Sequence, residues 1–161
     1  MGATVERMEE RVSGGEPVAD LVVRTSKLTG TIVSGSLVPR AIDELPLVAL
    51  LGCFAEGETV VRDAQELVVK ESNRVETTVD LLTRMGARIE ARPDGFVVHG
   101  PTPLHGARLD GRGDHRAGML GAIAGVLADG ETRIDNDAVG VSYPAFWEDL
   151  ARAATGGMIK A

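Results

Sequence analysis

Cationic side chains stand at two predicted helix starts, where the helix dipole disfavours them. Arg74 follows Asn73 at one start, and Arg116 follows Asp114 and His115 at the other. A helix N-terminus carries about half a positive charge and four free N–H donors, so arginine there is unfavourable unless an anion binds beside it. Backbone donors and a planar guanidinium together suit a carboxylate or a phosphate. The two starts therefore predict an anion-binding site; surface arginines that only form salt bridges are the alternative.

Two carboxylates accompany these cations. Glu71 stands beside Lys70 and near Arg74, and neighbouring positive charge favours its ionised form. It could act as a general acid or base, or serve only as an ion-pair partner. Asp43 begins a predicted buried helix whose first turn contains Pro46, which is typical of a helix cap. Abstraction of a proton from a hydroxyl group is the functional alternative for Asp43.

Other chemistries find no support in the sequence. There is no Gly-x-Ser-x-Gly segment and no phosphate-binding Gly-Lys-Ser/Thr loop, which disfavours a serine hydrolase and a nucleoside triphosphatase. His99, His105 and Cys53 lack the spacing of a zinc site. We therefore expect no metal.

The hydrophobic pattern predicts the elements that position these residues. Segments 45–55 and 117–128 are apolar on nearly all sides and read as buried helices, each followed by a glycine, Gly57 or Gly130. Segment 73–85 has apolar residues at helical spacing and reads as an amphipathic helix that ends at Gly86. Segments 88–91 and 96–99 flank a Pro-Asp-Gly turn and predict a hairpin, and short strands are expected at 21–24 and 107–110. The order is that of a β-α-β-α-β-β unit.

Two internal similarities indicate that this unit repeats. Residues 55–63 recur at 128–135, and residues 1–6 recur at 85–90 with a fainter echo at 156–159. The repeat length is thus about 70 to 85 residues. Because residue 1 matches the end of a helix in the other copy, we expect the chain to start within a unit and to be the C-terminal part of a longer protein. A short protein with a degenerate first repeat is the alternative.

Composition narrows the class of protein. The chain has 161 residues, enough for one domain or a large part of one, and 43% of them are hydrophobic. A formal net charge of −7 disfavours nucleic-acid binding. The single cysteine allows no internal disulfide, and the longest apolar run, 45–55, is short of the ~20 residues that a membrane helix needs. No signal peptide is evident at the start, so the expected location is the cytoplasm.

The sequence resembles the EPSP synthase family, the 3-phosphoshikimate 1-carboxyvinyltransferases, from about Met1 to Leu150. The resemblance rests on four blocks: 37–46 (LVPRAIDELP), 67–74 (LVVKESNR), 113–116 (GDHR) and 142–146 (SYPAF). It implies an α/β (α+β) fold in which repeated βαβαββ units form the inside-out barrel of the enolpyruvyl transferases, with buried helices inside and sheets outside.

The resemblance also implies an activity without a metal or an organic cofactor. The family transfers the enolpyruvyl group of phosphoenolpyruvate (PEP) to the 5-hydroxyl of shikimate 3-phosphate and releases phosphate. By similarity, Asp43 would hold and deprotonate that hydroxyl, and Glu71 would take part in proton transfer at the PEP methylene. The implied substrate contacts are Lys70 near the reacting hydroxyl and, around PEP, Arg74, Arg116 and the adjacent His115.

The resemblance covers somewhat more than the last third of the family's length. Residues 1–161 are therefore expected to form a partial C-terminal domain of about two units, which needs the missing N-terminal part as its partner and has no activity alone. Uncovered sheet edges and apolar helix faces predict self-association. The alternatives are a non-catalytic anion-binding or structural module of the same fold, and the related UDP-N-acetylglucosamine enolpyruvyl transferase, which does not show the Val-Lys-Glu-Ser block in this form.

Overall fold

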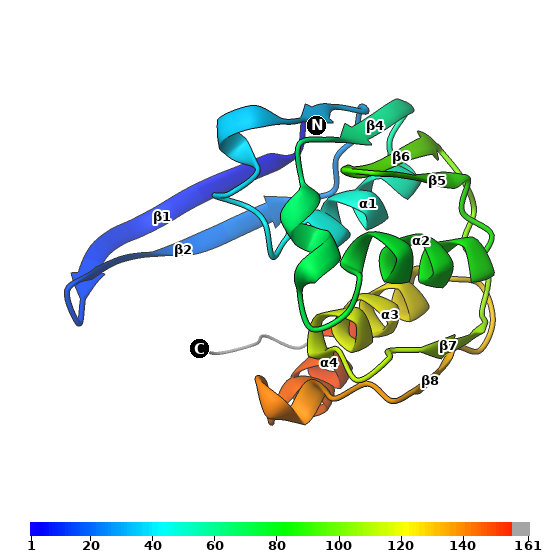
Figure 1. The fold of residues 1–161 in the computed structure, drawn as a ribbon. Helices are drawn as coiled ribbons and strands as arrows, with labels where there is room; N and C mark the ends of the chain where they lie inside the picture. Colours follow the sequence, from blue (N-terminus) through cyan, green and yellow to red (C-terminus); the bar gives the residue numbers. More distant parts are fainter. Residues whose placement is uncertain (156–161) are drawn as a thin grey trace.

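The middle of the chain forms one complete βαβαββ unit. The structure, a computed structural model, describes residues 1–155 (Figure 1). The elements of the unit are β3 (Ile32–Val33), α1 (Leu45–Phe54), β4 (Gly57–Val61), α2 (Arg74–Arg84), β5 (Ile89–Arg92) and β6 (Gly95–Gly100). The expected order of elements is confirmed, but the strand that precedes α1 is β3 and not the predicted segment 21–24.

The four strands of this unit make one sheet in the order β3-β4-β6-β5. β3 and β4 are parallel, whereas β4, β6 and β5 are antiparallel to their neighbours, with Thr59 opposite Val98. α1 packs on β6 and contacts α2 and α3 (His115–Leu127). These contacts bury one face of α1, whereas Leu47, Leu51 and Phe54 on its other face are 37% to 45% exposed, so the expectation of a helix buried on nearly all sides is only partly met.

Two incomplete sets of elements flank the unit. Before it, β1 (Thr4–Ser13) and β2 (Glu16–Arg24) form an antiparallel ribbon that projects from the body, drawn in blue in Figure 1. After it come β7 (Arg108–Asp110), α3, β8 (Arg133–Asp135) and α4 (Phe146–Ala154). β7 and β8 pair in parallel, as β3 and β4 do.

The backbone repeats the same contacts in successive units. His105 N–H donates to the carbonyl of Met85 at 2.8 Å, as Thr29 N–H donates to that of Met1 at 3.0 Å. A Cβ at Gly30 would lie 2.1 Å from the carbonyl oxygen of Glu58, and one at Gly106 would lie 2.3 Å from that of Glu131. Only glycine allows such close approach of two backbones. These matched backbone contacts agree with the two sequence similarities. The fainter similarity at 156–159 lies outside the described residues.

Some expected local features are confirmed and others are wrong. Asn73 accepts a hydrogen bond from Glu76 N–H at 3.2 Å, so the predicted cap of α2 is present. Asp43 is not a helix cap: Glu44 holds that position in α1, and the Asp43 carboxylate binds arginines instead. The short strand expected at 21–24 is part of the longer, mostly exposed β2, because it pairs with β1 outside the core. No helix of the described part of the chain has the length and hydropathy needed to cross a membrane.

Candidate anion-binding and active site

Arg74, the first residue of α2, is enclosed by three carboxylates. Its side chain is only 3% exposed. Nη1 lies 2.8 Å from Oδ1 of Asp43, Nη2 lies 2.5 Å from Oε2 of Glu71, and Nε lies 2.9 Å from Oδ2 of Asp114. Burial by itself would lower the pKa of Arg74, but the bond to Asp114 and the nearby carboxylates raise it. Arg74 therefore orients Asp43 and Glu71 by charge-assisted hydrogen bonds.

Asp114 joins the start of α3 to the start of α2. Its side chain has no exposed surface, and its Oδ1 accepts from Arg116 N–H at 2.9 Å as the cap of α3. Oδ2 accepts from Ser72 Oγ and from Arg74 Nε, both at 2.9 Å. Burial opposes the ionised form, yet these hydrogen bonds and the charge of Arg74 outweigh it and hold the pKa of Asp114 below its usual range. Asp114 therefore connects the starts of α2 and α3 through one network of buried charges and hydrogen bonds.

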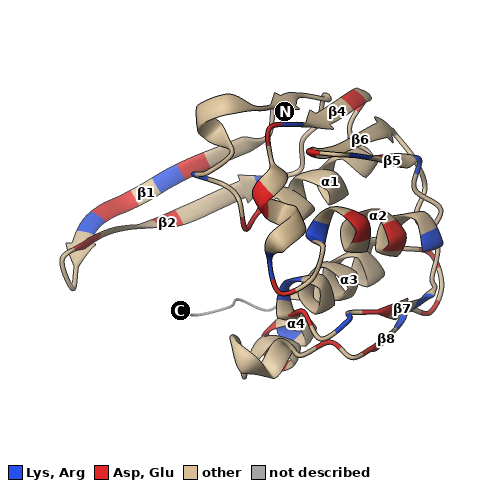
Figure 2. Cartoon of the chain, in the orientation of Figure 1, with Lys and Arg blue, Asp and Glu red and all other residues tan. Residues whose placement is uncertain are grey.

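Arg116 also contacts Asp43, the aspartate that Arg74 binds. Its Nη2 lies 3.3 Å from Oδ2 of Asp43, and its Nη1 lies 3.2 Å from the Asp43 carbonyl oxygen and 3.4 Å from Oε1 of Glu44. The side chain is 33% exposed, and its contacts are longer than those of Arg74. Arg116 is therefore the guanidinium of the pair that can more readily turn toward a bound anion. Figure 2 shows the cationic starts of α2 and α3 on the same side of the molecule.

The remaining predicted site residues differ in how closely they join this cluster. Lys70 donates to Oε1 of Glu66 at 2.7 Å, which raises the pKa of its amine, and the charge of Asp43 adds to that rise. Glu71 contacts Arg74 and is half-exposed. His115 is half-buried at the first position of α3, and the contacts found among residues 1–155 give it no hydrogen bond or ion pair.

A small pocket opens beside Asp43 and Arg116. It measures about 180 Å³ and lies between the start of α1, the middle of α3 and the start of α4. Apart from these two charged residues its walls are mainly apolar, with Tyr143 and Phe146 at one side. Arg74 does not line it. The two arginines thus share the Asp43 carboxylate, whereas only Arg116 faces this pocket.

The sequence pointed to most of this cluster but not to every member. Asp43, Glu71, Arg74 and Arg116 are brought together as expected. The buried bond between Asp114 and Arg74 was missed, because a cap explains an aspartate at a helix start without any distant partner. Ser72 was also missed, although it stands inside the Lys-Glu-Ser block. Among the described residues, no group of three or more His, Cys, Asp or Glu side chains is arranged to hold a metal ion.

The fold and site define an α/β protein of the enolpyruvyl transferase class. An EPSP synthase from Acinetobacter baumannii superposes with a TM-score of 0.87 at 35% identity, over 94% of this chain and 36% of that one. The enolpyruvyl transferase NikO from Streptomyces tendae shares the fold, with a TM-score of 0.63 at 24% identity over 92% of this chain and 32% of that one.

Within this class, sequence comparison gives the family. The family model for EPSP synthase (3-phosphoshikimate 1-carboxyvinyltransferase) matches residues 1–150, and the chain belongs to this family. The 3-phosphoshikimate 1-carboxyvinyltransferase of Roseiflexus sp. strain RS-1 is 52% identical over 155 residues, or 96% of this chain. That of Brevibacillus brevis is 47% identical over 153 residues, or 94% of the chain. In both cases the chain spans about 36% of the relative's length.

Proposed function

We propose that this chain supplies part of a 3-phosphoshikimate 1-carboxyvinyltransferase, with PEP and shikimate 3-phosphate as substrates. The observation that carries the proposal is the position of the Asp43 carboxylate between the guanidinium groups of Arg74 and Arg116. A carboxylate held by the buried Arg74 is in place before the substrate arrives, so its reorganisation costs little during the reaction. The remainder of the enzyme, which the chain does not contain, completes the site.

In this proposal the carboxylates of Asp43 and Glu71 transfer the protons. The attacking hydroxyl must lose a proton, and the methylene carbon of PEP must gain one and later return it. Asp43 accepts the hydroxyl proton, and Glu71 acts at the methylene. Both carboxylates touch Arg74 on different nitrogens, at 2.8 Å and 2.5 Å, so one buried guanidinium fixes their relative position.

Binding of the anionic substrates falls to the cationic side chains. Arg116 makes the main contact with PEP, since its guanidinium is partly exposed and its present bonds are 3.2 to 3.4 Å long. Arg74 adds positive potential from behind the carboxylates and remains a predicted PEP contact. Lys70 contacts substrate near the reacting hydroxyl, and His115 lies beside PEP. No metal or organic cofactor takes part, and the enzyme works in the cytoplasm.

A chimaeric enzyme tests the function directly. Residues 1–150 of this chain replace the matching segment of the Roseiflexus sp. enzyme, and phosphate release is measured with PEP and shikimate 3-phosphate. We expect turnover, with a loss of at least about a hundredfold in kcat for Asp43→Asn or Glu71→Gln, the size of a general acid or base contribution. Arg92→Ala is the matched control, because Arg92 is half-exposed on β5 and pairs with Glu90. A folded chimaera without turnover would contradict the proposal.

The isolated chain gives a second test. Alone it should release no phosphate above background, because half of the site is absent and water has free access. PEP should still bind weakly in a titration followed by amide chemical shifts, and Arg116→Ala should weaken binding by about tenfold or more, since a hydrogen bond to a charged group contributes about 1.5 to 3 kcal/mol. Binding that is unchanged in Arg116→Ala would leave a purely structural module as the better description.

A further inference from the structure

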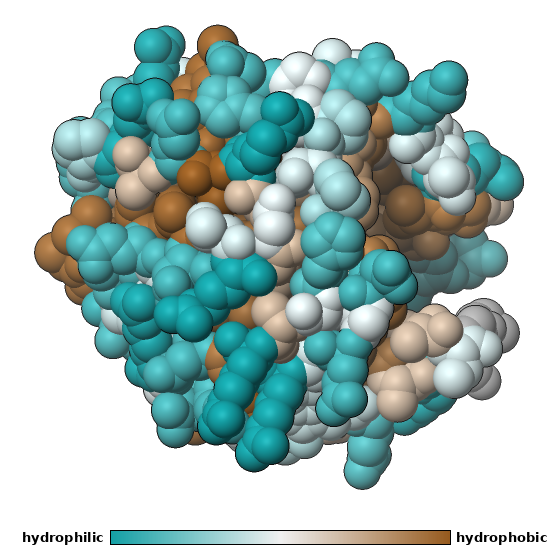
Figure 3. Space-filling model, turned by 90° about the vertical axis from the view of Figure 1, so that its right-hand side faces the viewer, coloured by the Kyte–Doolittle hydropathy of each residue, from teal (hydrophilic) through white to brown (hydrophobic). Residues whose placement is uncertain are grey.

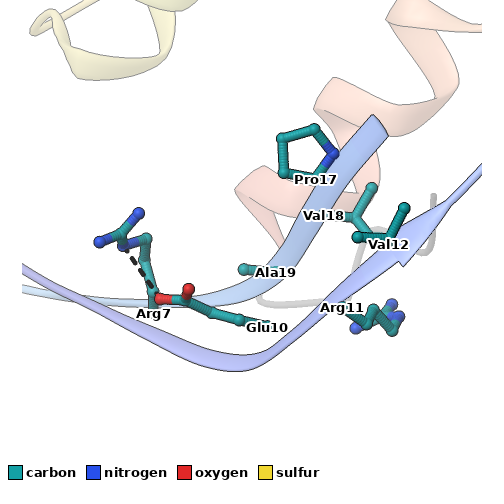
Figure 4. Close-up of a pocket in the computed structure, with 7 residues that line it drawn as sticks. All are labelled: Arg7, Glu10, Arg11, Val12, Pro17, Val18 and Ala19. Carbon is teal, nitrogen blue, oxygen red and sulfur yellow. Dashed lines mark ion pairs between the residues drawn. The ribbon is translucent and has the colours of Figure 1, made fainter. Parts of the chain in front are cut away.

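Most charged side chains of the chain lie on its surface. Figure 3 shows polar side chains spread over one face, and Figure 4 shows an exposed ion pair of β1, Arg7 with Glu10, beside a surface pocket of the β1–β2 ribbon. Both side chains of that pair are more than half exposed, and such pairs contribute little to stability. Arg74 and Asp114 differ, because they are the only buried charged residues within residues 1–155. A group that contacts this buried pair can therefore influence the site strongly.

The hydroxyl of Ser72 is hydrogen-bonded to the buried pair. Its Oγ donates to Oδ2 of Asp114 at 2.9 Å, and the same oxygen accepts from Nε of Arg74 at 2.9 Å. Oδ1 of Asp114 accepts from Arg116 N–H at 2.9 Å. Oγ1 of the buried Thr77 donates in turn to Ser72 Oγ at 3.4 Å. Bonds to both oxygens thus fix the rotation of the Asp114 carboxylate, and Ser72 makes one of them.

Ser72 does not cap α2. A serine beside a helix start commonly has that role, but Asn73 holds the cap position and accepts from Glu76 N–H at 3.2 Å. Ser72 stands one residue earlier, and its hydroxyl binds a side chain that is 42 positions away along the chain. The bond therefore joins two units of the fold and does not stabilise the start of a helix.

Arg74 connects Ser72 to the two carboxylates of the site. A guanidinium group is planar, so the direction of Nε also sets the directions of both terminal nitrogens. Nη1 binds Oδ1 of Asp43, and Nη2 binds Oε2 of Glu71. Among the described residues, Ser72 has no hydrogen bond of its own to either carboxylate. Any effect of its hydroxyl on them therefore passes through Asp114 and Arg74.

We propose that Ser72 is a positioning residue of the transferase reaction, which holds Oδ2 of Asp114 toward Nε of Arg74 and so aligns Asp43 and Glu71. The inference rests on the proposed function of these two carboxylates. Without the hydroxyl, Asp114 keeps its charge and its bond to Arg74, so the chain still folds. The carboxylate and the guanidinium gain freedom to rotate, however, and a misplacement of about 1 Å can lower a rate about a hundredfold.

Kinetics of the chimaeric enzyme test the effect on the reaction. Ser72→Ala should lower kcat at least about tenfold, because both proton-transfer groups lose alignment. The KM for PEP should change less than about threefold, since Arg116, the main PEP contact, is held through Asp43 and Glu44. Ser72→Thr keeps the hydroxyl and should keep most of the activity. Equal losses in Ser72→Ala and Ser72→Thr would contradict a role for the hydroxyl.

Ser26→Ala is the matched control. Ser26 Oγ also makes two hydrogen bonds, one from Thr4 N–H and one to the carbonyl oxygen of Arg24, both at 2.9 Å, where the β1–β2 ribbon joins the body. Each alanine variant thus loses one donor and one acceptor, and their urea midpoints should shift by similar amounts. Only Ser72→Ala should lower kcat. A similar kcat in the two variants would overturn the proposal.

The Nε–H signal of Arg74 tests the connection in the isolated chain, without any turnover. Exchange of this buried proton with solvent requires local opening of the network. Ser72→Ala should shift the signal and accelerate its exchange at least about fivefold, the size expected for the loss of one hydrogen bond. Ser26→Ala should leave both unchanged. An Arg74 signal that Ser72→Ala does not alter would refute the positioning role, whereas a folded parent chimaera without turnover would count against the proposed function alone.

Discussion

Nε of Arg74 lies 2.9 Å from Oδ2 of Asp114, and the two side chains are 3% and 0% exposed. The bond connects the first residue of α2 to the cap of α3, and these helices belong to successive units. A buried charge without its partner costs several kcal/mol, so each group requires the other. The position of one unit relative to the next is therefore fixed at the same place where Asp43 and Glu71 are oriented.

Replacement of Asp114 by Asn should destabilise the whole chain. The change removes the charge that compensates the buried Arg74, and loss of one partner of a buried ion pair costs about 3 to 5 kcal/mol. Urea unfolding followed by circular dichroism measures the difference. Asp80→Asn is the control, because Asp80 pairs with Arg84 and Arg112 at the surface and should cost less than about 1 kcal/mol. Equal losses in the two variants would contradict the special role of Asp114.

The Asp114–Arg74 pair should also make stability depend on acid pH. The pKa of Asp114 is lower in the folded chain than in the unfolded chain, where an aspartate titrates near pH 4. Its contribution is thus complete above about pH 4 and is lost as the pH falls through the lower folded pKa. The difference in unfolding free energy between the parent and Asp114→Asn should be constant from pH 5 to 7 and shrink below about pH 4. A difference that grows on acidification would have the wrong sign.

The thiol of Cys53 should resist modification in the folded chain. Burial raises its pKa to about 11, although a backbone hydrogen bond opposes part of that rise. The side chain has no exposed surface, and the thiolate is the reactive form. Ellman's reagent at pH 8 should label Cys53 only after denaturant is added, at the rate of unfolding. Immediate labelling of the native chain would show that α1 does not pack against β6 as described.

The sequence predicted those parts of the structure that depend on local pattern. The helices at 45–54 and 74–84 and the β5–β6 hairpin follow from periodicity and turn residues. The role of Asp43 was harder to predict from the sequence. An aspartate that caps a helix and one that binds arginines look the same there, and the two arginines are 31 and 73 positions away along the chain. The exposed length of β1–β2 was not predictable either, because burial depends on which strands lie beside the ribbon and not on its own residues.

Thr59 offers a test of how completely the sheet covers α1. Its Oγ1 is buried and has no hydrogen-bond partner among the described residues, and such a group costs about 1 to 3 kcal/mol to desolvate. Val has nearly the same shape without the hydroxyl. Thr59→Val should therefore raise the free energy of unfolding by about 1 kcal/mol, as measured by urea denaturation.

Thr132 is the matched position in the next unit, and its Oγ1 is also buried without a partner in the described part of the chain. The residue as a whole is only partly buried there, because none of the strands described in residues 1–155 covers it from the side that β6 occupies beside Thr59. Thr132→Val should thus stabilise the chain less than Thr59→Val does, by a few tenths of a kcal/mol. If Thr59→Val instead destabilised the chain, its hydroxyl would have a partner, and the dry contact between α1, β4 and β6 would be wrong.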